Sequence, residues 1–352
     1  MSDPKQPPGD LADRAAACDR RLADALAERL TLAAAERSAG GSGAPELREA
    51  WVEGLVASLE PPLKTAARSV LQQLRVELNA LAAPVTVAYL GPEGGLTTQV
   101  VRARYGAAAG LIECATIAQC LEEVTRGRAQ VAVFPFESSE DGLSQVALDA
   151  LAKSELSLIA EHRLTSRYDL VSQTGNLSDV EKLYLTSSAR AACAGFVGRE
   201  LPKAAALEVR SPALAVHFAQ GDAGSAAIVP QGSELRDLQV VQANVGDEPD
   251  TRYRFGVAAE RPAPRSGKDA TAVLFSVDDA AGALFDVLRH FVERGVNLRL
   301  LQSRPVQGAS WDYVFYAELS GHVTDRALVT AIESVKRTTR LLRVLGSFPS
   351  DG

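Results

Sequence analysis

The chain has 352 residues, of which 46% are hydrophobic and 23% charged, and its formal net charge is −7. This length allows two or three domains, and the negative charge argues against a general nucleic-acid-binding protein. No apolar run has the length of a membrane span, and residues 1–10 lack the features of a signal peptide. We therefore expect no transmembrane segment and no signal peptide. The four cysteines have neither metal-binding nor redox spacing. We therefore expect reduced thiols, no bound metal and a cytoplasmic protein.

The N-terminal part of the chain is predicted to be helical. We expect residues 1–10 to be disordered. From residue 11 to residue 84 the chain is rich in alanine and leucine and has a helical period. A Gly-Gly-Ser-Gly segment from Gly40 and a Pro-Pro pair at Pro61 interrupt this pattern, and Pro84 ends it. The sequence therefore predicts an all-α region over residues 11–84.

From Val85 onward, short apolar strands alternate with helical segments. This alternation predicts an α/β domain over residues 85–262. The segments VTVAYL and VAVFPF are two of its expected buried strands. A proline- and glycine-containing stretch, RPAPRSGK from Arg261 to Lys268, is expected to link this domain to the last module.

A glycine-rich loop follows the first of these strands. It reads GPEGGLTT and leads into an expected helix. Backbone N–H groups at a helix N-terminus can bind an anion, and threonine hydroxyls can add donors. The alternative is a purely structural turn, because a single glycine-rich turn is a weak signal. The candidate binding residues are Gly91, Glu93, Gly94, Thr97 and Thr98.

The second buried strand ends in polar residues. Glu137, Ser138 and Ser139 follow Pro135 in the segment VAVFPFESSEDG. Ligands of α/β sheets bind beyond the carboxyl ends of the strands. These three residues are therefore candidate binding residues, and a polar turn without a ligand is the alternative.

Residues 269–352 predict a smaller α+β module. Ala272–Val277 and Val296–Leu301 are expected strands, and apolar residues between them recur at helical spacing from Leu284 to Val292. Gly295 is placed to end that helix. A loop that enters a helix can bind a carboxylate, whereas a plain α+β domain with a packing glycine is the alternative.

Motifs in this module resemble those of the ACT domain that ends prephenate dehydratases. The sequence GAL at Gly282 matches the family's GAL motif, and QSRP at Gln302 matches ESRP with Gln in place of Glu. The segments Asn297-Leu298 and Trp311–Phe315 also fit the family pattern. The resemblance implies a ferredoxin-like α+β fold that pairs in a homodimer or homotetramer and binds phenylalanine as an effector. It places the effector at Gly282, Ala283, Leu284, Asn297, Gln302, Ser303, Arg304 and Pro305.

The middle region resembles the two-lobed α/β domain of the same family. The loop at Gly91 is similar to the family's GPEGTFS, with Gly95 and Leu96 in place of Thr and Phe. The segment around Glu137 is similar to VPIENSxxG, with Ser138 where Asn is expected. The resemblance implies that both segments line a pocket for prephenate, and it implies no cofactor.

The family's catalytic Thr-Arg-Phe triplet fits the segment DTRYRFGV in two registers. The preferred register is set by the spacing from Asn244 and Asp247, and its triplet is Tyr253-Arg254-Phe255. In this register a phenol replaces the hydroxyl that is thought to help the ring hydroxyl leave. The second register, Thr251-Arg252-Tyr253, is shifted by two residues. Because side chains along a strand alternate with a period of two, each position of the triplet faces the same side of the sheet in both registers.

The N-terminal helices occupy the place of the helical chorismate mutase domain found in bifunctional members of the family. Arg29, Arg48 and Glu49 match charged residues of that domain. Ala12 and Gly40, however, stand where an essential Arg and Lys are expected. We therefore expect a dimerisation region without mutase activity.

These resemblances predict a prephenate dehydratase that forms phenylpyruvate, water and CO₂ under control by phenylalanine. Arg254 is the expected carboxylate anchor, with Tyr253 or Thr251 as the proton donor. Two alternatives stay open. One is a catalytically reduced homologue that senses an amino acid and binds a partner, and the other is a decarboxylase that does not aromatise prephenate.

Overall fold

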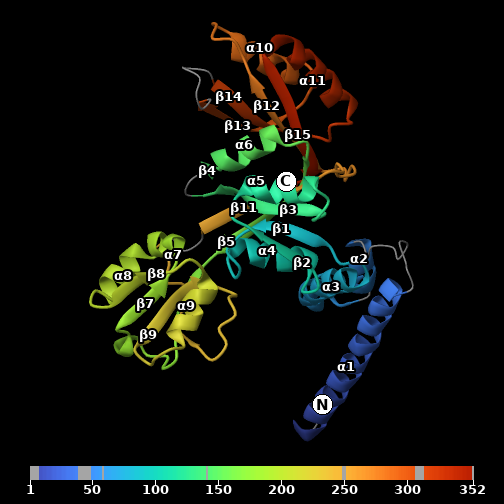
Figure 1. The fold of residues 1–352 in the computed structure, drawn as a ribbon. Helices are drawn as coiled ribbons and strands as arrows, with labels where there is room; N and C mark the ends of the chain where they lie inside the picture. The colour runs from blue at the N-terminus through green and yellow to red at the C-terminus, as the bar shows by residue number, and fades with distance from the viewer. Residues whose placement is uncertain are drawn as a thin grey trace, which may run out of the picture. The chain divides into compact units, whose positions relative to one another are not determined.

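The computed structural model describes residues 8–38, 49–57, 59–139, 142–247, 251–305 and 313–350. The chain divides into two compact units. One unit consists of Met1–Val85 and Arg102–Gly110, and the other of Thr86–Val101 and Leu111–Gly352. Figure 1 shows helices in the N-terminal part of the first unit and sheets with covering helices in the second.

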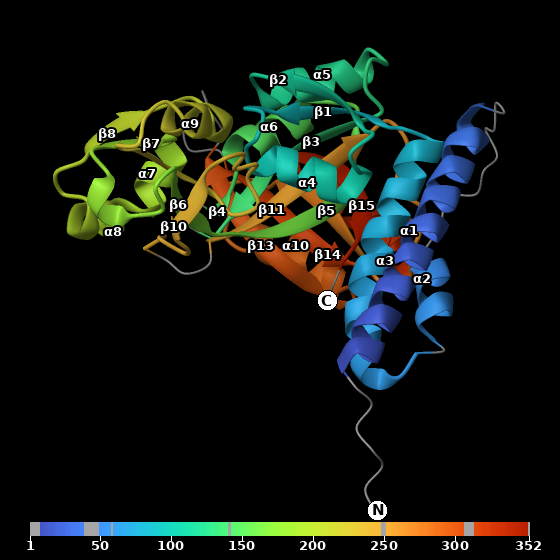
Figure 2. The ribbon, with the colours of Figure 1, turned by 90° about the horizontal axis from the view of Figure 1, so that it is seen from below.

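The N-terminal helices are α1 (Pro8–Ser38), α2 (Glu49–Val56) and α3 (Pro61–Ala82). Figure 2 shows α1 and α2 alongside α3. The Pro-Pro pair lies at the start of α3, where a missing N–H breaks no helical hydrogen bond. Helix α1 begins at Pro8, within the segment 1–10 that was expected to be disordered, and residues 1–7 lie outside the described part of the chain. Among the described residues, no helix is long and apolar enough to cross a membrane.

The larger unit begins with a mixed sheet that forms the first lobe of the α/β domain. Its strand order is β2-β1-β3-β11-β5, with β4 paired to β3. Strands β1 and β3 are parallel, whereas β11 runs antiparallel to both β3 and β5. The elements are β1 (Thr86–Leu90), α4 (Leu96–Tyr105), β2 (Gly110–Cys114), α5 (Ile117–Thr125), β3 (Val131–Ser138), β4 (Gly142–Leu143), α6 (Gln145–Lys153), β5 (Ser157–Ser166) and β11 (Thr251–Ala259).

A second sheet forms the other lobe, with the order β10-β6-β9-β7-β8. The chain passes from the first lobe to the second between β5 and β6, and it returns between β10 and β11. The elements are β6 (Tyr168–Ser172), η1 (Leu177–Asp179), β7 (Lys182–Leu185), α7 (Ser187–Ala192), α8 (Ala194–Glu200), β8 (Ala205–Glu208), α9 (Pro212–Ala219), β9 (Ser225–Pro230) and β10 (Gln239–Gln242). The predicted two-lobed α/β architecture is therefore confirmed.

The C-terminal module has the predicted ferredoxin-like order of strands and helices. Its sheet runs β13-β14-β12-β15, and α10 and α11 pack on one face around Val273, Phe275 and Phe291. Tyr316, on the other face, joins the core of the first lobe. The elements are β12 (Asp269–Ser276), α10 (Ala283–Val292), β13 (Leu298–Pro305), β14 (Tyr313–Ser320), α11 (Arg326–Thr338) and β15 (Leu341–Pro349).

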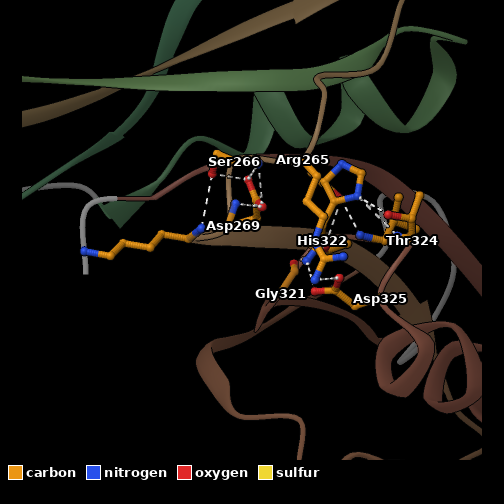
Figure 3. Close-up of polar contacts among 12 residues, drawn as sticks. Arg265, Ser266, Asp269, Gly321, His322, Thr324 and Asp325 are labelled. Carbon is orange, nitrogen blue, oxygen red and sulfur yellow. Dashed lines mark hydrogen bonds and ion pairs between the residues drawn. The ribbon is translucent and has the colours of Figure 1, made fainter. Parts of the chain in front are cut away.

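Polar contacts fix the linker to this module (Figure 3). Arg265 forms an ion pair with Asp325 at 2.7 Å, and Ser266 donates a hydrogen bond of 2.6 Å to Asp269. The buried His322 ring has Nε2 3.1 Å from the carbonyl oxygen of Ala263. The linker is therefore a structured part of the module rather than a flexible tether.

The module also contacts the first lobe through β15, which packs against β5. Gly346 has a φ of 145°. A Cβ atom at this position would overlap the carbonyl oxygen of Leu158 and lie 2.6 Å from its backbone nitrogen. Only glycine permits this close approach of two strands.

Gly346→Ala should strongly destabilise the larger unit. We expect an overpacking cost of up to about 3 kcal/mol in addition to the cost of a positive φ. Gly267→Ala is the matched control, since Gly267 has a φ of 92° but no atom within 4 Å of an added Cβ. Thermal unfolding followed by circular dichroism measures both variants. Equal unfolding midpoints would contradict the close packing of β15 on β5.

Candidate active site

Strand β11 carries the expected catalytic triplet and lies between β3 and β5. Tyr253 pairs with Ser138 of β3, and Arg254 pairs with Glu137. The pairing with β3 shifts register between Arg254 and Phe255, which is the sign of a β-bulge. The structure therefore brings the triplet and the polar end of β3 together.

The side chain of Arg254 lies in a buried cluster of carboxylates. Its Nε is 2.8 Å from Glu137, and its Nη1 is 3.1 Å from Glu161 and 2.6 Å from Glu318. The guanidinium also lies over the ring of Phe136, at 5.2 Å from the centroid. Arg254 is only 8% exposed. Three protein carboxylates thus contact Nε and Nη1 of the expected anchor, whereas its buried Nη2 has no hydrogen-bond partner among the described residues.

These carboxylates keep the guanidinium charged. Burial acts to lower the pKa of Arg254, but the charges of Glu318 and Glu137 outweigh it and raise the pKa. Tyr316 donates a hydrogen bond of 2.5 Å to Glu318. Burial and the charge of Glu318 raise the pKa of Tyr316 well above its usual value, so this phenol stays protonated. The cluster is a fixed network of charges and donors.

Tyr253 connects the triplet to the second lobe. Its ring lies 6.3 Å from the ring of the buried Phe255. Its hydroxyl interacts with that of Tyr168, at the start of β6. Burial raises the pKa of Tyr168, although hydrogen bonds with Ser188 and Tyr253 oppose this shift. Two tyrosine hydroxyls therefore meet where the lobes join, and Tyr168 carries its proton at neutral pH.

Glu113 on β2 holds the glycine-rich loop in place, and sequence reasoning missed it. Its Oε2 accepts a hydrogen bond of 3.1 Å from the backbone of Glu93 and lies 3.4 Å from the hydroxyl of Tyr89. Burial, followed by the charge of Glu113, raises the pKa of Tyr89 to about 12. The side chain of Glu113 also fills the space beside Gly91, where a Cβ atom would clash. The loop is therefore held by a carboxylate from a neighbouring strand.

Helix N-termini from the two lobes meet at this loop. A Cβ atom at Gly94 would lie 3.4 Å from the Cβ and 3.5 Å from the backbone nitrogen of Ala213, in the first turn of α9. Ser211 caps α9 by accepting a hydrogen bond from Leu214. The N-terminus of α4 follows the loop, with Thr97 buried in its first turn. Two helix N-termini in one place favour binding of an anion.

The polar end of β3 contacts β11 and lines a cavity. Ser139 exchanges hydrogen bonds with the backbone of Arg252, at 2.8 Å and 3.1 Å. Ser138 and Glu137 line a cavity of about 530 Å³ together with residues of the ACT-like module. The other residues around this cavity are Ser139, Arg163, Leu164, Thr165, Arg252, Tyr253, Arg254, Arg299, Leu300 and Glu318.

The predicted site residues thus fall into two groups. Gly94 of the glycine-rich loop faces α9 of the second lobe, whereas the end of β3 and the charged end of Arg254 face the C-terminal module. Tyr253 lies between them, because it lines the cavity and also contacts Tyr168. Thr251, the donor in the second register, is 3% exposed and therefore less accessible than the half-buried Tyr253.

The expected effector residues lie on α10 and β13. Gly282 precedes α10 in a left-handed conformation with a φ of 86°, and Asn297 is exposed just before β13. Gln302 extends toward the first lobe, since its Nε2 is 4.0 Å from a Cβ built at Gly142. Ala283 and Leu284 are half-buried and Ser303 is exposed, while the side chains of Arg304 and Pro305 lie outside the described part.

Of the residues expected as remnants of a mutase site, the structure describes one side chain. Arg29 is half-exposed on α1. Arg48 and the side chain of Glu49 lie outside the described residues.

Comparison with known proteins identifies the family. The prephenate dehydratase model matches residues 87–263, and the ACT domain model matches residues 271–337. The chain belongs to the prephenate dehydratase family. The bifunctional chorismate mutase/prephenate dehydratase of Aquifex aeolicus is 33% identical over 271 residues, which cover 77% of this chain and 75% of that protein. The prephenate dehydratase of Mycobacterium marinum is 32% identical over 281 residues, covering 75% of this chain and 88% of its own.

A solved structure agrees with this membership. The crystal structure of the prephenate dehydratase of Arthrobacter aurescens in complex with L-Phe has 33% sequence identity and a TM-score of 0.65. The match covers 76% of this chain and 90% of that one.

Arg254→Met should destabilise the dehydratase domain by about 3–5 kcal/mol, because it leaves buried carboxylates without their cation. Arg252→Met is the control, since Arg252 is exposed on the same strand and its loss should cost within about 0.5 kcal/mol. Urea unfolding followed by fluorescence measures both. Similar stabilities for the two variants would show that Arg254 does not hold the carboxylate cluster together.

Proposed function

We propose that this protein is a prephenate dehydratase that converts prephenate to phenylpyruvate and is regulated by phenylalanine. Its membership of the family over both the dehydratase and ACT domains carries the proposal. The reaction breaks the bond to the ring carboxylate, and the electron pair of that bond enters the ring as the ring hydroxyl leaves. The leaving hydroxyl takes up a proton and departs as water.

Such a reaction needs a cradle for two carboxylates and one positioned proton donor. We assign the cradle to the glycine-rich loop from Gly91 to Thr98 and the facing N-terminus of α9. Its support is the close approach of Gly94 to Ala213. Helix N-termini present N–H groups and a partial positive charge to an anion. This assignment requires no arginine in the cradle.

We assign the proton donor to Tyr253, with Tyr168 as its hydrogen-bond partner. A phenol reaches further than the threonine hydroxyl typical of the family. Tyr168 in the second lobe supplies a contact that directs the longer side chain. Arg254 then orients the donor, because Nε and Nη1 of its guanidinium contact Glu137, Glu161 and Glu318.

Phenylalanine is the proposed effector. The assignment of its site to the GAL and QSRP segments stays a prediction. The pairing of ACT domains in a homodimer or homotetramer also stays a prediction. The relative from Arthrobacter aurescens has been crystallised with L-Phe. We also expect a cytoplasmic location, and we expect no chorismate mutase activity from the N-terminal helices. Ala12 and Gly40 stand where that reaction needs cations.

Purified protein incubated with prephenate should form phenylpyruvate well above the spontaneous rate. Tyr253→Phe removes only the phenolic oxygen and should lower kcat by about 100-fold, as expected for the loss of a general acid. Tyr184→Phe is the control, because Tyr184 stacks on Phe218 in the second lobe and should leave kcat unchanged.

Two results would contradict this account. No phenylpyruvate from the wild-type protein, with phenylalanine still bound in calorimetry, would favour a catalytically reduced sensor. A non-aromatic decarboxylated product would instead identify the decarboxylase alternative. Full activity of Tyr253→Phe in an active wild-type background would remove Tyr253 as the donor.

A further inference from the structure

We propose that Glu318, a residue of the ACT domain, is a positioning residue of the dehydratase site. It acts by fixing Arg254 and, through the backbone of β11, the orientation of Tyr253. The inference rests on the proposed dehydratase function and assigns to the regulatory domain a direct part in shaping the catalytic strand.

Glu318 is held rigidly. It lies on β14, an interior strand paired with both β12 and β13. Its Oε1 accepts hydrogen bonds from Arg254 at 2.6 Å and from Tyr316 at 2.5 Å. Glu318 is 5% exposed. A buried carboxylate with two short donors has little freedom to move, so it can define the position of its partner.

Arg254 in turn is fixed on several sides. Glu161 of β5 shares Nη1 with Glu318, and Glu137 of β3 lies at Nε. The ring of Phe136 lies against the guanidinium. Glu137 and Glu161 belong to the strands on either side of β11, whereas Glu318 comes from a different sheet. Of these three carboxylates, Glu318 is therefore the one whose position depends on where the ACT domain lies.

The backbone transmits this position to the donor. The shift in pairing between β11 and β3 falls directly after Arg254, and Tyr253 directly precedes it. The ladder with β5 stays in register from Thr251 to Val257, so the irregularity lies on the β3 side only. On that side the strand is set less firmly by hydrogen bonds, and side-chain contacts such as that of Arg254 with Glu318 add to its geometry. If Arg254 loses Glu318, we expect the bulge to relax and Tyr253 to lose its alignment with Tyr168.

The same strand pair offers a route for the effector. Gln302 and Leu300 of β13 pair with Tyr316 and Glu318 of β14, respectively. Gln302 is one of the residues assigned to the effector site. A change at Gln302 therefore reaches Glu318 through Tyr316, which pairs with Gln302 and donates a hydrogen bond to Glu318.

Glu318→Gln tests the proposal, because it removes the charge and keeps the shape. We expect kcat for phenylpyruvate formation to fall at least tenfold while KM stays within twofold, since the carboxylate cradle lies elsewhere. Inhibition by phenylalanine should weaken severalfold, although phenylalanine binds with unchanged affinity in calorimetry. Glu318→Asp should recover part of kcat. Glu333→Gln, at an exposed position on α11 of the same domain, should behave as the wild type.

Tyr316→Phe provides a second variant that keeps the buried charge pair and removes only the second donor to Glu318. We expect it to fold, as judged by circular dichroism, and to lower kcat about threefold. If Glu318→Gln does not fold, an unchanged kcat in Tyr316→Phe overturns the proposal.

The remaining outcomes are also decisive. A wild-type protein that forms no phenylpyruvate removes the proposed function, and the positioning role falls with it. If the wild type is active and folded Glu318→Gln has the same kcat, the positioning role of Glu318 is overturned, whereas the proposed function stands. A raised KM with unchanged kcat would show that Glu318 acts on substrate binding, and this result also contradicts the proposal.

Discussion

The geometry of the catalytic strand depends on one buried guanidinium. Removing a charged group from water costs several kcal/mol, and the cost is offset only when the partners are close and well oriented. Arg254 meets this condition with carboxylates from β3, β5 and the ACT domain. Because no two of these carboxylates come from the same strand, their common cation fixes the relative positions of three strands. The strand that carries Arg254 also carries Tyr253, so the charge cluster and the proposed donor share one backbone.

The two sides of β11 have different physical characters. On one side lie the phenols of Tyr253 and Tyr168 and the facing helix N-termini, whose N–H groups can bind an anion. On the other side, carboxylates outnumber the buried arginine. The cavity on this side is also lined by Arg163, Arg252 and Arg299. The buried arginine of the expected triplet therefore pairs with the protein's own carboxylates, while other arginines line the cavity.

Much of the fold could be predicted from the sequence, since it follows from local pattern. The alternation of apolar strands and helices indicated the α/β domain, and the spacing around Gly282 and Gly295 indicated an α+β module, for which the motif resemblance implied the ACT fold. The contacts of Arg254 could not be predicted in this way, because its partners Glu161 and Glu318 lie 93 and 64 residues away in the chain. Glu318 did leave a signal, as a single charged residue within the apolar strand segment YVFYAEL. A charge in such a strand requires a buried partner, but the sequence does not name that partner. Glu113 was missed because its role depends on the pairing of β2 beside β1.

The most direct test of this account is a double-mutant cycle on kcat for phenylpyruvate formation, with Arg254→Lys, Glu318→Gln and the double variant. If Glu318 acts through Arg254, the double variant should lose little more activity than the more damaged single variant, as for residues that act as a unit. If the two fold losses multiply in the double variant, Glu318 and Arg254 act independently, and the account is contradicted.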